Sequence, residues 1–255
     1  MLGVSIAGAL DTPQILLDES NQQQAAKKAI QVNKVWAKKI GINQAARITL
    51  GKPDGNTSVT FGCAPGFHPH HSRRYFRRIQ CNKHDPLFKF FKEHNPHMCQ
   101  ESVWSSNKTD EVITFPITAP ETAIIKDDLT ALKHLELIKK SQQNWVIPGT
   151  TEANKKNITH NISCTVLVRD NEWEDVTNYL YKNREIFTAV SLLPYTGDKI
   201  YKQAPLEAVT TPEDEALWKK LVENYRPVDY KKLYEEDDNT KLMEEAACSG
   251  GQCLI

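Results

Sequence analysis

A strand–helix–strand pattern in the last third of the chain constrains the fold more than any other feature. Residues 163–168 are mostly apolar and rich in β-branched side chains, residues 173–181 have a helical spacing of apolar side chains, and residues 189–193 form a second apolar run that Pro194 ends. A helix that connects two strands of one sheet in this way leaves them parallel. The pattern therefore predicts an α/β fold with a parallel sheet or barrel.

The rest of the chain continues this alternation. Residues 47–50 and 112–117 are β-rich and are expected to form strands. Apolar side chains at Ala25, Ala29, Val32, Trp36 and Ile40 recur every three or four residues, which predicts a helix that ends at Gly41. Two more helices are expected, one after Asp127 and Asp128 with Leu132, Leu135 and Ile138 on its apolar face, and one over residues 212–225.

Composition and charge limit the class of protein. The 255 residues include 32 Lys and Arg against 32 Asp and Glu, so the whole chain has no overall attraction for nucleic acid or for a membrane surface. The apolar run over residues 2–10 lacks a basic leader and is too short to cross a bilayer. Six cysteines without a secretion signal are more typical of reduced thiols than of disulfides. We therefore expect a cytoplasmic protein with no membrane partner.

The C-terminal segment carries two thiols on a glycine-containing tail. Cys248 and Cys253 are separated by Ser-Gly-Gly-Gln, and the preceding residues are dense in Asp, Glu and Lys. Such a segment is expected to be solvated, so we predict a folded part over residues 1–229 and a flexible tail over residues 230–255. A tethered dithiol favours thiol–disulfide exchange. The alternatives are a disordered terminus with two incidental cysteines, or a zinc site that needs two further ligands.

A polar loop is the most suggestive ligand site. Residues 51–58 follow an expected strand, and such loops bind ligands in α/β folds. Gly55 permits close approach, and backbone N–H groups with the side chains of Asn56, Thr57 and Ser58 could donate to phosphate oxygens. Asp54 would repel phosphate unless its carboxylate is turned away. The spacing is not that of a Walker loop, so a plain turn is the competing interpretation.

A second polar segment, residues 68–78, interleaves basic and aromatic side chains. Its arginines, Arg73, Arg74, Arg77 and Arg78, could hold nucleic acid or a phosphorylated ligand. The alternative is a basic surface helix or strand with Tyr75 and Phe76 packed inward. Nearby Cys63, Cys81 and Cys99 match no standard zinc spacing, so no metal site is expected.

Several motifs, taken in order, resemble a known family. They are Gly3-Val-Ser-Ile-Ala-Gly-Ala-Leu-Asp, Lys52-Pro-Asp-Gly-Asn-Thr-Ser, Gly66-Phe-His-Pro, Tyr75-Phe-Arg-Arg, Asn161-Ile-Ser-Cys-Thr-Val, Ser191-Leu-Leu-Pro-Tyr, Tyr201-Lys-Gln-Ala-Pro-Leu-Glu and the terminal Cys-x4-Cys. Together they resemble class II, adenosylcobalamin-dependent ribonucleotide reductases, with the ribonucleoside-triphosphate reductases as the nearest form. The resemblance runs from about Gly3 to the end of this chain but covers only the C-terminal part of the enzyme.

This resemblance implies the C-terminal portion of a ten-stranded α/β barrel. It also implies radical chemistry: adenosylcobalamin generates a cysteine thiyl radical, which takes the 3′-hydrogen of a ribonucleotide so that the 2′-hydroxyl leaves as water. Two barrel cysteines supply the electrons and become a disulfide. A C-terminal cysteine pair then reduces that disulfide and is itself reduced by a thioredoxin-like protein.

The family motifs assign roles to residues of this chain. Cys248 and Cys253 match the shuttle pair, and the loop from Pro53 to Ser58 matches the substrate-phosphate site, with Asp54 where many relatives have serine. The remaining cysteines match no catalytic position, and Cys164 is expected to be a packed core thiol. The thiyl cysteine and the reducible pair lie upstream of the matched segment in the family. We therefore expect no turnover by this chain alone, which would be either one half of a split reductase with an N-terminal reductase polypeptide as partner, or a gene fragment. The alternative function is a non-catalytic nucleic-acid-binding protein that uses Arg73–Arg78.

Overall fold

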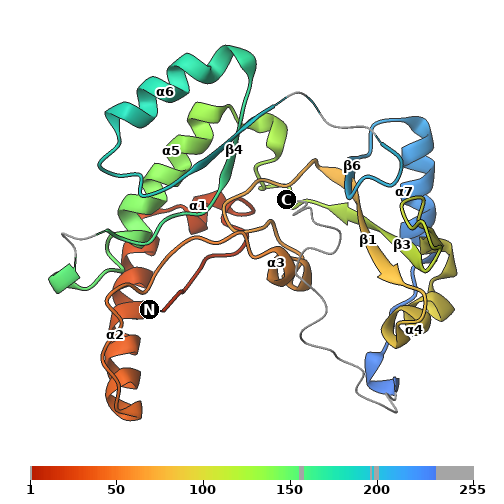
Figure 1. The fold of residues 1–255 in the computed structure, drawn as a ribbon, viewed down its shortest axis with the longest axis horizontal. Coiled ribbons are helices and arrows are strands. Elements are labelled where there is room, and N and C mark those ends of the chain that lie inside the picture. Colours follow the sequence, from red (N-terminus) through yellow and green to blue (C-terminus); the bar gives the residue numbers. More distant parts are fainter. Residues whose placement is uncertain (1, 155–157, 196, 198–200, 234–255) are drawn as a thin grey trace. The chain divides into compact units, whose positions relative to one another are not determined.

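The structure, a computed structural model, describes residues 2–154, 158–195, 197 and 201–233 (Figure 1). The described part of the chain divides into two compact units, residues 2–77 with 116–218 and residues 78–115 with 219–233, apart from the gaps just given. The α-helices are α1 (Pro13–Leu16), α2 (Glu19–Ile40), α3 (Gly55–Phe61), α4 (Pro86–His94), α5 (Ala131–Ser141), α6 (Trp173–Lys182) and α7 (Pro212–Asn224). The strands are β1 (Arg74–Asn82), β2 (Cys99–Glu101), β3 (Asp110–Thr118), β4 (Thr165–Val168), β5 (Ser191–Pro194) and β6 (Leu206–Ala208).

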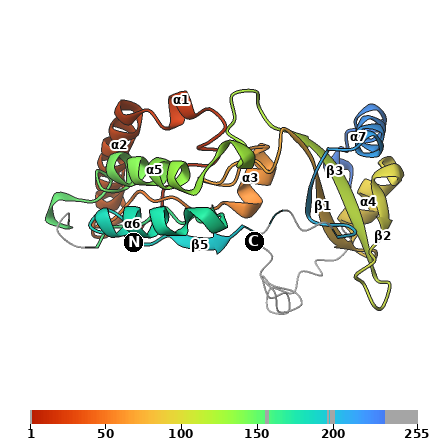
Figure 2. The same cartoon turned by 90° about the horizontal axis from the view of Figure 1, so that it is seen from above.

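The predicted strand–helix–strand pattern is confirmed. Strands β4 and β5 pair in parallel from Thr165↔Ser191 to Val168↔Pro194, and α6 connects them. Val166, Val168 and Val176 are fully buried in the core of the first unit. Helix α5 contacts α2, β4 and α6, and Figure 2 shows it lying between α2 and α6. The β-branched strand residues thus give this unit its apolar centre.

Helix α2 has the predicted end but not the expected apolar contact face. Gly41 ends the helix in the left-handed conformation, at φ 74°, which glycine adopts without steric cost. Ala26 and Ala37 are buried, whereas Trp36 and Ile40 of the predicted stripe are 56% and 62% exposed. The buried side is instead fixed by Gln22, whose amide donates to the Ser141 hydroxyl. The helix therefore packs through its small residues, and the larger apolar side chains of the predicted stripe stay exposed.

An antiparallel sheet was not predicted. Four strands pair in the order β2-β3-β1-β6, and β1 and β3 each continue from one unit into the other. The expected strand at 112–117 is confirmed as β3, and the basic segment is a strand, β1, with Tyr75 and Phe76 buried. The expected strand at 47–50 forms only isolated bridges. The prediction of a parallel architecture was therefore incomplete, and the fold is mixed α and β.

The two remaining helix predictions are confirmed. Helix α5 begins after Thr130, whose hydroxyl caps it by accepting from the Lys133 N–H, while the acidic pair 127–128 lies in a preceding 3-10 turn. Helix α7 begins at Pro212, as expected. No helix in the described part of the chain is long and apolar enough to span a bilayer.

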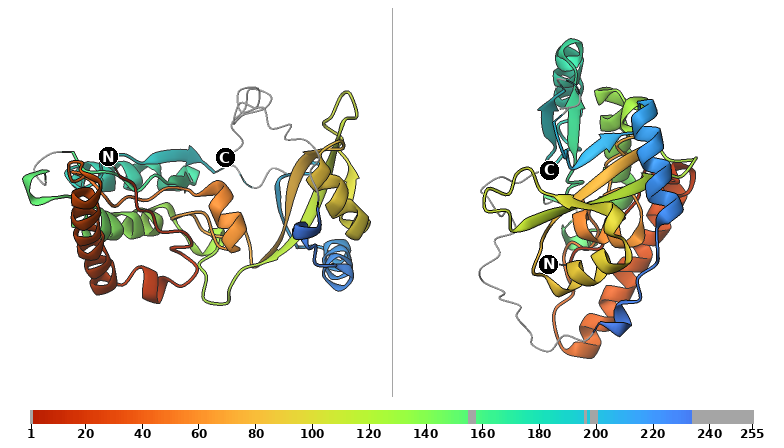
Figure 3. Two further views of the ribbon diagram at one scale, coloured as in Figure 1. Left: turned by 90° about the horizontal axis from the view of Figure 1, so that it is seen from below. Right: turned by 90° about the vertical axis from the view of Figure 1, so that its right-hand side faces the viewer.

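The second unit is built on helix α4. The Asp85 carboxylate caps the helix by accepting from the Phe88 N–H, and the Phe91 ring contacts the Phe115 ring in a tilted arrangement, with the ring centres 5.6 Å apart. Lys92 pairs at 2.7 Å with Glu111, which is buried. Figure 3 shows α4 against the strands of this unit. A contact between two aromatic rings and one partly buried ion pair hold the helix in place.

Cys164 is a core thiol, as predicted. It is 4% exposed, and its Sγ lies 3.3 Å from Nε2 of His134, which donates to the Phe67 carbonyl at 2.9 Å. Burial raises the pKa of the Cys164 thiol to about 12 and lowers the pKa of His134 to about 4. Both groups are therefore neutral near pH 7, and this cysteine is a poor nucleophile.

Gly66 is required by a close backbone contact. It adopts φ 57°, and a Cβ there would lie 2.0 Å from the Lys52 carbonyl oxygen. Gly62 has a similar φ of 66° with nothing within 4 Å of the same position. A side chain at Gly62 would therefore meet only the strain of the left-handed conformation, whereas a side chain at Gly66 would meet that strain and a clash with backbone.

We expect Gly66→Ala to lower the free energy of unfolding by roughly 3 kcal/mol or more, because the methyl group displaces backbone as well as imposing strain. Gly62→Ala should cost only about 1 to 2 kcal/mol. Urea unfolding of the two variants and of the wild-type chain measures the difference. Equal losses at the two positions would contradict the clash.

Candidate functional site

Four segments far apart in the sequence run parallel in the first unit. Val4 bridges Thr49, Gly51 bridges Ile162, and β4 pairs with β5, each in the parallel sense. Gly51 exchanges two backbone hydrogen bonds with the third segment, donating to the Asn161 carbonyl at 3.1 Å and accepting from the Ser163 N–H at 2.8 Å. Parallel segments share one carboxyl edge, which is where α/β folds bind ligands.

The polar loop leaves this edge directly after Gly51. Its Lys52 N–H donates to the Ser5 hydroxyl at 3.0 Å, and that hydroxyl in turn donates to the Asp54 carboxylate at 3.3 Å. Asp54 adopts a left-handed conformation, φ 51°, which is uncommon for a residue other than glycine and is often found at functional sites. The Asp54 carboxylate is thus engaged by Ser5, from the neighbouring parallel segment.

The structure places the other predicted loop residues in two groups. Pro53 precedes Asp54 and is partly buried, and Gly55, Asn56, Thr57 and Ser58 form the first turn of α3. Thr57 is exposed, whereas Ser58 is fully buried and its hydroxyl donates to the Gly55 carbonyl at 3.2 Å. The first intrahelical bond joins the Ser58 N–H to the Asp54 carbonyl. The N–H groups of residues 55–57 therefore precede Ser58, the first intrahelical donor, and point out of the helix start.

A buried polar network behind the loop was missed by sequence reasoning. The Asp11 carboxylate accepts from the Ala64 N–H at 3.2 Å and lies 3.0 Å from Nε2 of His70. The other ring nitrogen of His70 lies 3.2 Å from the Tyr75 hydroxyl. Burial raises the pKa of Tyr75, which stays protonated at neutral pH. The three residues are 5 to 64 positions apart, and only their shared burial would have grouped them.

This network fixes the chain on either side of α3. Asp11 follows the first parallel segment, and Ala64 follows α3. The Asp11 carbonyl also accepts from the Thr122 hydroxyl at 2.7 Å. A buried carboxylate that pairs with a backbone N–H and an imidazole holds both partners in defined positions. The Asp11 carboxylate therefore fixes the position of the backbone at Ala64, where the chain leaves α3.

Arg73 and Arg74, two of the four arginines in residues 73–78, are engaged by partners within the chain. Arg73 donates to the carbonyls of Pro120 and Glu121 and pairs with Asp128 at 3.3 Å. Arg74 forms a two-point ion pair with Glu215 and lies over the Trp218 ring at 5.2 Å. The carboxylates of Asp128 and Glu215 neutralise positive charge that binding of nucleic acid would use. They therefore weigh against the alternative function of nucleic-acid binding, which remains a prediction.

The cysteines divide into those the structure describes and those it does not. Cys248 and Cys253 lie outside the described residues, so the predicted shuttle pair remains a prediction. Burial raises the thiol pKa of Cys63 and Cys81, and raises that of Cys99 to about 11. These three are therefore mostly protonated at pH 7. Among the described residues, no group of three or more His, Cys, Asp or Glu side chains could hold a metal ion.

No protein-family profile matches the chain. Among curated proteins, the adenosylcobalamin-dependent ribonucleoside-triphosphate reductase of Lactobacillus delbrueckii subsp. bulgaricus is 24% identical over 242 residues, which cover 91% of this chain and 30% of the relative. A probable adenosylcobalamin-dependent ribonucleoside-triphosphate reductase of Dictyostelium discoideum is 26% identical over 230 residues, covering 88% of this chain and 27% of the relative. The chain thus spans about 30% of the length of the curated relatives it matches.

A solved structure has a similar fold. A B12-dependent, class II ribonucleotide reductase aligns with 80% of this chain and 27% of its own, at 21% identity and a TM-score of 0.63. The resemblance predicted from the motifs is therefore confirmed: over 91% of its length this chain is similar to adenosylcobalamin-dependent ribonucleoside-triphosphate reductases, and its fold is that of part of a class II ribonucleotide reductase.

Proposed function

We propose that this chain is one part of an adenosylcobalamin-dependent ribonucleoside-triphosphate reductase, which converts ribonucleotides to deoxyribonucleotides. The observation that carries the proposal is the similarity to such reductases over 91% of the chain. The parallel segments at Val4, Gly51, β4 and β5 would then be strands of a ten-stranded barrel that another part of the reductase completes. The cytoplasm is the proposed location.

The loop from Pro53 to Ser58 is the proposed substrate-phosphate site. Three features support it: its place after a parallel segment, the N–H groups at the start of α3, and the Asp54 carboxylate engaged by Ser5. Backbone N–H groups in such a turn suit phosphate oxygens. Because the Ser58 hydroxyl donates within the helix, the donors are the main chain and the exposed Thr57 side chain.

Cys248 and Cys253 are the proposed redox shuttle. In one turn of the shuttle, the two thiols give two electrons and two protons to the active-site disulfide and become a disulfide themselves. A thioredoxin-like protein then reduces that new disulfide. The high thiol pKa values of Cys99 and Cys164 support this choice, because thiols that stay protonated exchange slowly.

Adenosylcobalamin would supply the radical that starts the reaction. The pocket among the described residues that is lined by Lys126, Leu129, Leu167, Arg169 and Tyr195 has a volume of about 20 Å³, which does not fit a corrin. The cofactor site would be completed by the partner polypeptide that carries the remaining parts of the reductase.

Reconstitution tests the proposed function. The purified chain is combined with a polypeptide that carries the remaining parts of such a reductase, and deoxycytidine triphosphate is measured after addition of adenosylcobalamin, cytidine triphosphate and a dithiol. We expect product only when both polypeptides are present. Product from this chain alone would contradict a divided reductase, and no product from the pair would contradict the function itself.

The shuttle role predicts a loss that depends on the reductant. In the reconstituted enzyme, the double variant Cys248→Ser with Cys253→Ser should lower turnover with thioredoxin by about 100-fold or more. The reason is that no tethered dithiol then reaches the active-site disulfide at high effective concentration. Turnover with a small dithiol, which reaches the active-site disulfide directly, should be retained. Cys81→Ser is the matched control. An equal loss with both reductants would indicate a structural role.

The phosphate role predicts a charge effect at Thr57. Thr57→Glu places a carboxylate in the first turn of α3, where it is compatible with the helix but repels phosphate. We expect the KM for cytidine triphosphate to rise by about tenfold or more. Val59→Glu, on the same helix and also exposed, should leave the KM within about twofold. Equal KM values for the two variants would place the substrate phosphate elsewhere.

A further inference from the structure

Residues 65–68 pack against the start of the polar loop. Gly66 lies so close to the Lys52 carbonyl that a Cβ at Gly66 would be 2.0 Å from its oxygen and 3.2 Å from Cα of Pro53. The Ala9 N–H also donates to the Gly66 carbonyl at 2.9 Å. The backbone at Lys52 and Pro53 therefore rests on residues 65–68, and a movement of this segment would move the loop.

His68 fastens this segment to β4. Its Nδ1 lies 3.1 Å from the Pro65 carbonyl oxygen, and its Nε2 accepts from the N–H of Thr165, the first residue of β4, at 3.1 Å. A carbonyl oxygen only accepts, and a backbone N–H only donates. The two partners therefore require a neutral ring, with its proton on Nδ1 and a lone pair on Nε2.

Protonation of His68 and its hydrogen bond to Thr165 exclude each other. The imidazolium form carries a proton on each nitrogen, so both nitrogens are donors. The proton on Nε2 would then face the Thr165 N–H, and two donors cannot share a hydrogen bond. His68 is partly buried, where a polar group without a partner is costly, so the two groups would have to separate.

A second histidine holds the neighbouring residue of the same segment. His134 Nε2, on α5, donates to the Phe67 carbonyl at 2.9 Å, and the Cys164 thiol donates to the same oxygen at 3.5 Å. Phe67, His134 and Cys164 are all buried, whereas His68 is only partly so. His68 is therefore the member of this cluster that is open to protons from solvent.

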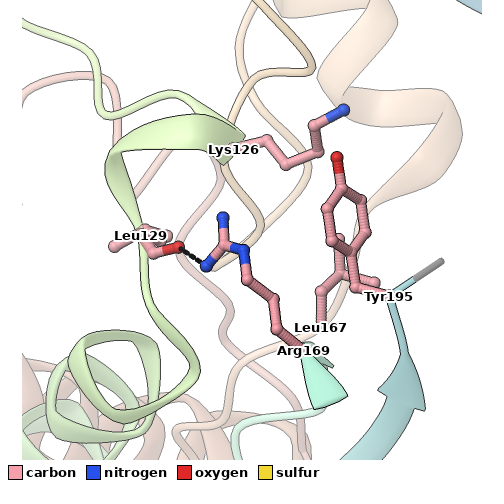
Figure 4. A pocket seen from close by; sticks show the side chains of 5 residues that line it. All are labelled: Lys126, Leu129, Leu167, Arg169 and Tyr195. Carbon is pink, nitrogen blue, oxygen red and sulfur yellow. Dashed lines mark hydrogen bonds between the residues drawn. The ribbon is translucent and has the colours of Figure 1, made fainter. Parts of the chain in front are cut away.

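Strand β4 is held independently of His68. It pairs in parallel with β5 from Thr165 to Val168. Just beyond its carboxyl end, Arg169 Nη1 donates to the Leu129 carbonyl at 3.3 Å, which Figure 4 marks. Loss of the contact between His68 and Thr165 would therefore release residues 65–68 and leave β4 in place.

The two buried titratable groups next to this contact are neutral. Burial lowers the pKa of His134 on α5 to about 4, and burial raises the pKa of Cys164, just before β4, to about 12. Burial also lowers the pKa of His68. Neither His134 nor Cys164 therefore offers a negative charge to a proton on His68.

The two carboxylates of the segments around residues 65–68 are engaged elsewhere. Asp11 pairs with Nε2 of His70 at 3.0 Å, and Asp54 accepts from the Ser5 hydroxyl at 3.3 Å. The polar loop also carries Lys52, which is a cation. Among the described residues, burial is the largest influence on the pKa of His68, and it opposes the charged form.

We propose that His68 is a pH-sensitive latch, which fastens residues 65–68 and the polar loop to β4 at neutral pH and releases them in acid. Because the pKa of His68 in the closed segment lies below the ordinary value of 6.5, opening takes up a proton. The latch therefore holds at full strength above about pH 6.5 and weakens as the pH falls below it. The proposal does not depend on reductase activity, so it can fail or succeed independently of the proposed function.

Hydrogen exchange of the full chain tests the latch. Exchange of the Thr165 N–H is measured by NMR at about pH 7.5 and about pH 5.5, one unit on either side of the ordinary pKa of histidine, and corrected for the intrinsic rate at each pH. His68→Gln keeps one acceptor and one donor and is neutral at both pH values. We expect protection in the wild type to fall roughly threefold to tenfold more than in His68→Gln, because one histidine favours opening by at most about tenfold over this range.

The polar loop provides a second readout. The Lys52 N–H, which donates to the Ser5 hydroxyl, should lose protection in parallel with Thr165, and should lose less of it in His68→Gln. The matched control is His84→Gln, which removes an exposed histidine and should show the same fall as the wild type. An equal fall in the wild type and in His68→Gln, or a fall at Thr165 without one at Lys52, would overturn the proposal.

A titration of the wild type decides the result if His68→Gln does not fold. The ¹⁵N shifts of the His68 ring report which nitrogen carries the proton. We expect a neutral ring with its proton on Nδ1 at about pH 7.5, and a titration midpoint below about 6.5. A midpoint at or above this value, or a neutral ring with its proton on Nε2, would overturn the latch.

Discussion

The parallel backbone pairing at Gly51 is the constraint on which the rest of the first unit depends. Its two hydrogen bonds with Asn161 and Ser163 join the start of the chain to the strand–helix–strand unit. A Cβ at Gly51 would lie 2.8 Å from both Ile162 and Phe67, so only glycine allows the segments to come this close. The polar loop, the return through Gly66 and the buried Cys164 all follow from this contact.

Some of the fold could be predicted because the signal was local. The apolar spacing of β4, α6 and β5, the glycine that ends α2 and the proline that begins α7 each act within a few residues. The antiparallel sheet was missed because its strands are short or mixed in polarity, and their partners are far apart in sequence. β1, for example, pairs with β6 more than 100 residues later. Such pairing depends on tertiary contacts, which a local pattern does not contain.

The candidate site divides in the same way. The loop at residues 51–58 could be identified from its glycines, polar side chains and position after an apolar run. The network of Asp11, His70 and Tyr75 could not, because each residue alone has an ordinary sequence context. Likewise, the partners that engage Arg73 and Arg74, namely Asp128 and Glu215, are more than 50 residues away. The sequence therefore indicated positive charge without indicating how much of it the fold neutralises.

The inward-turned hydroxyl of Ser58 has a consequence for recognition. With that side chain donating to the Gly55 carbonyl, the start of α3 offers a ligand mainly its peptide N–H groups. Almost every amino acid supplies the same peptide N–H group. Substitutions in this turn would therefore leave its N–H donors in place, provided that the glycines remain. Such N–H groups also recognise the charge and geometry of a ligand and do not distinguish one nucleobase from another. If the loop holds the proposed phosphate group, discrimination among bases would then depend on groups outside the loop.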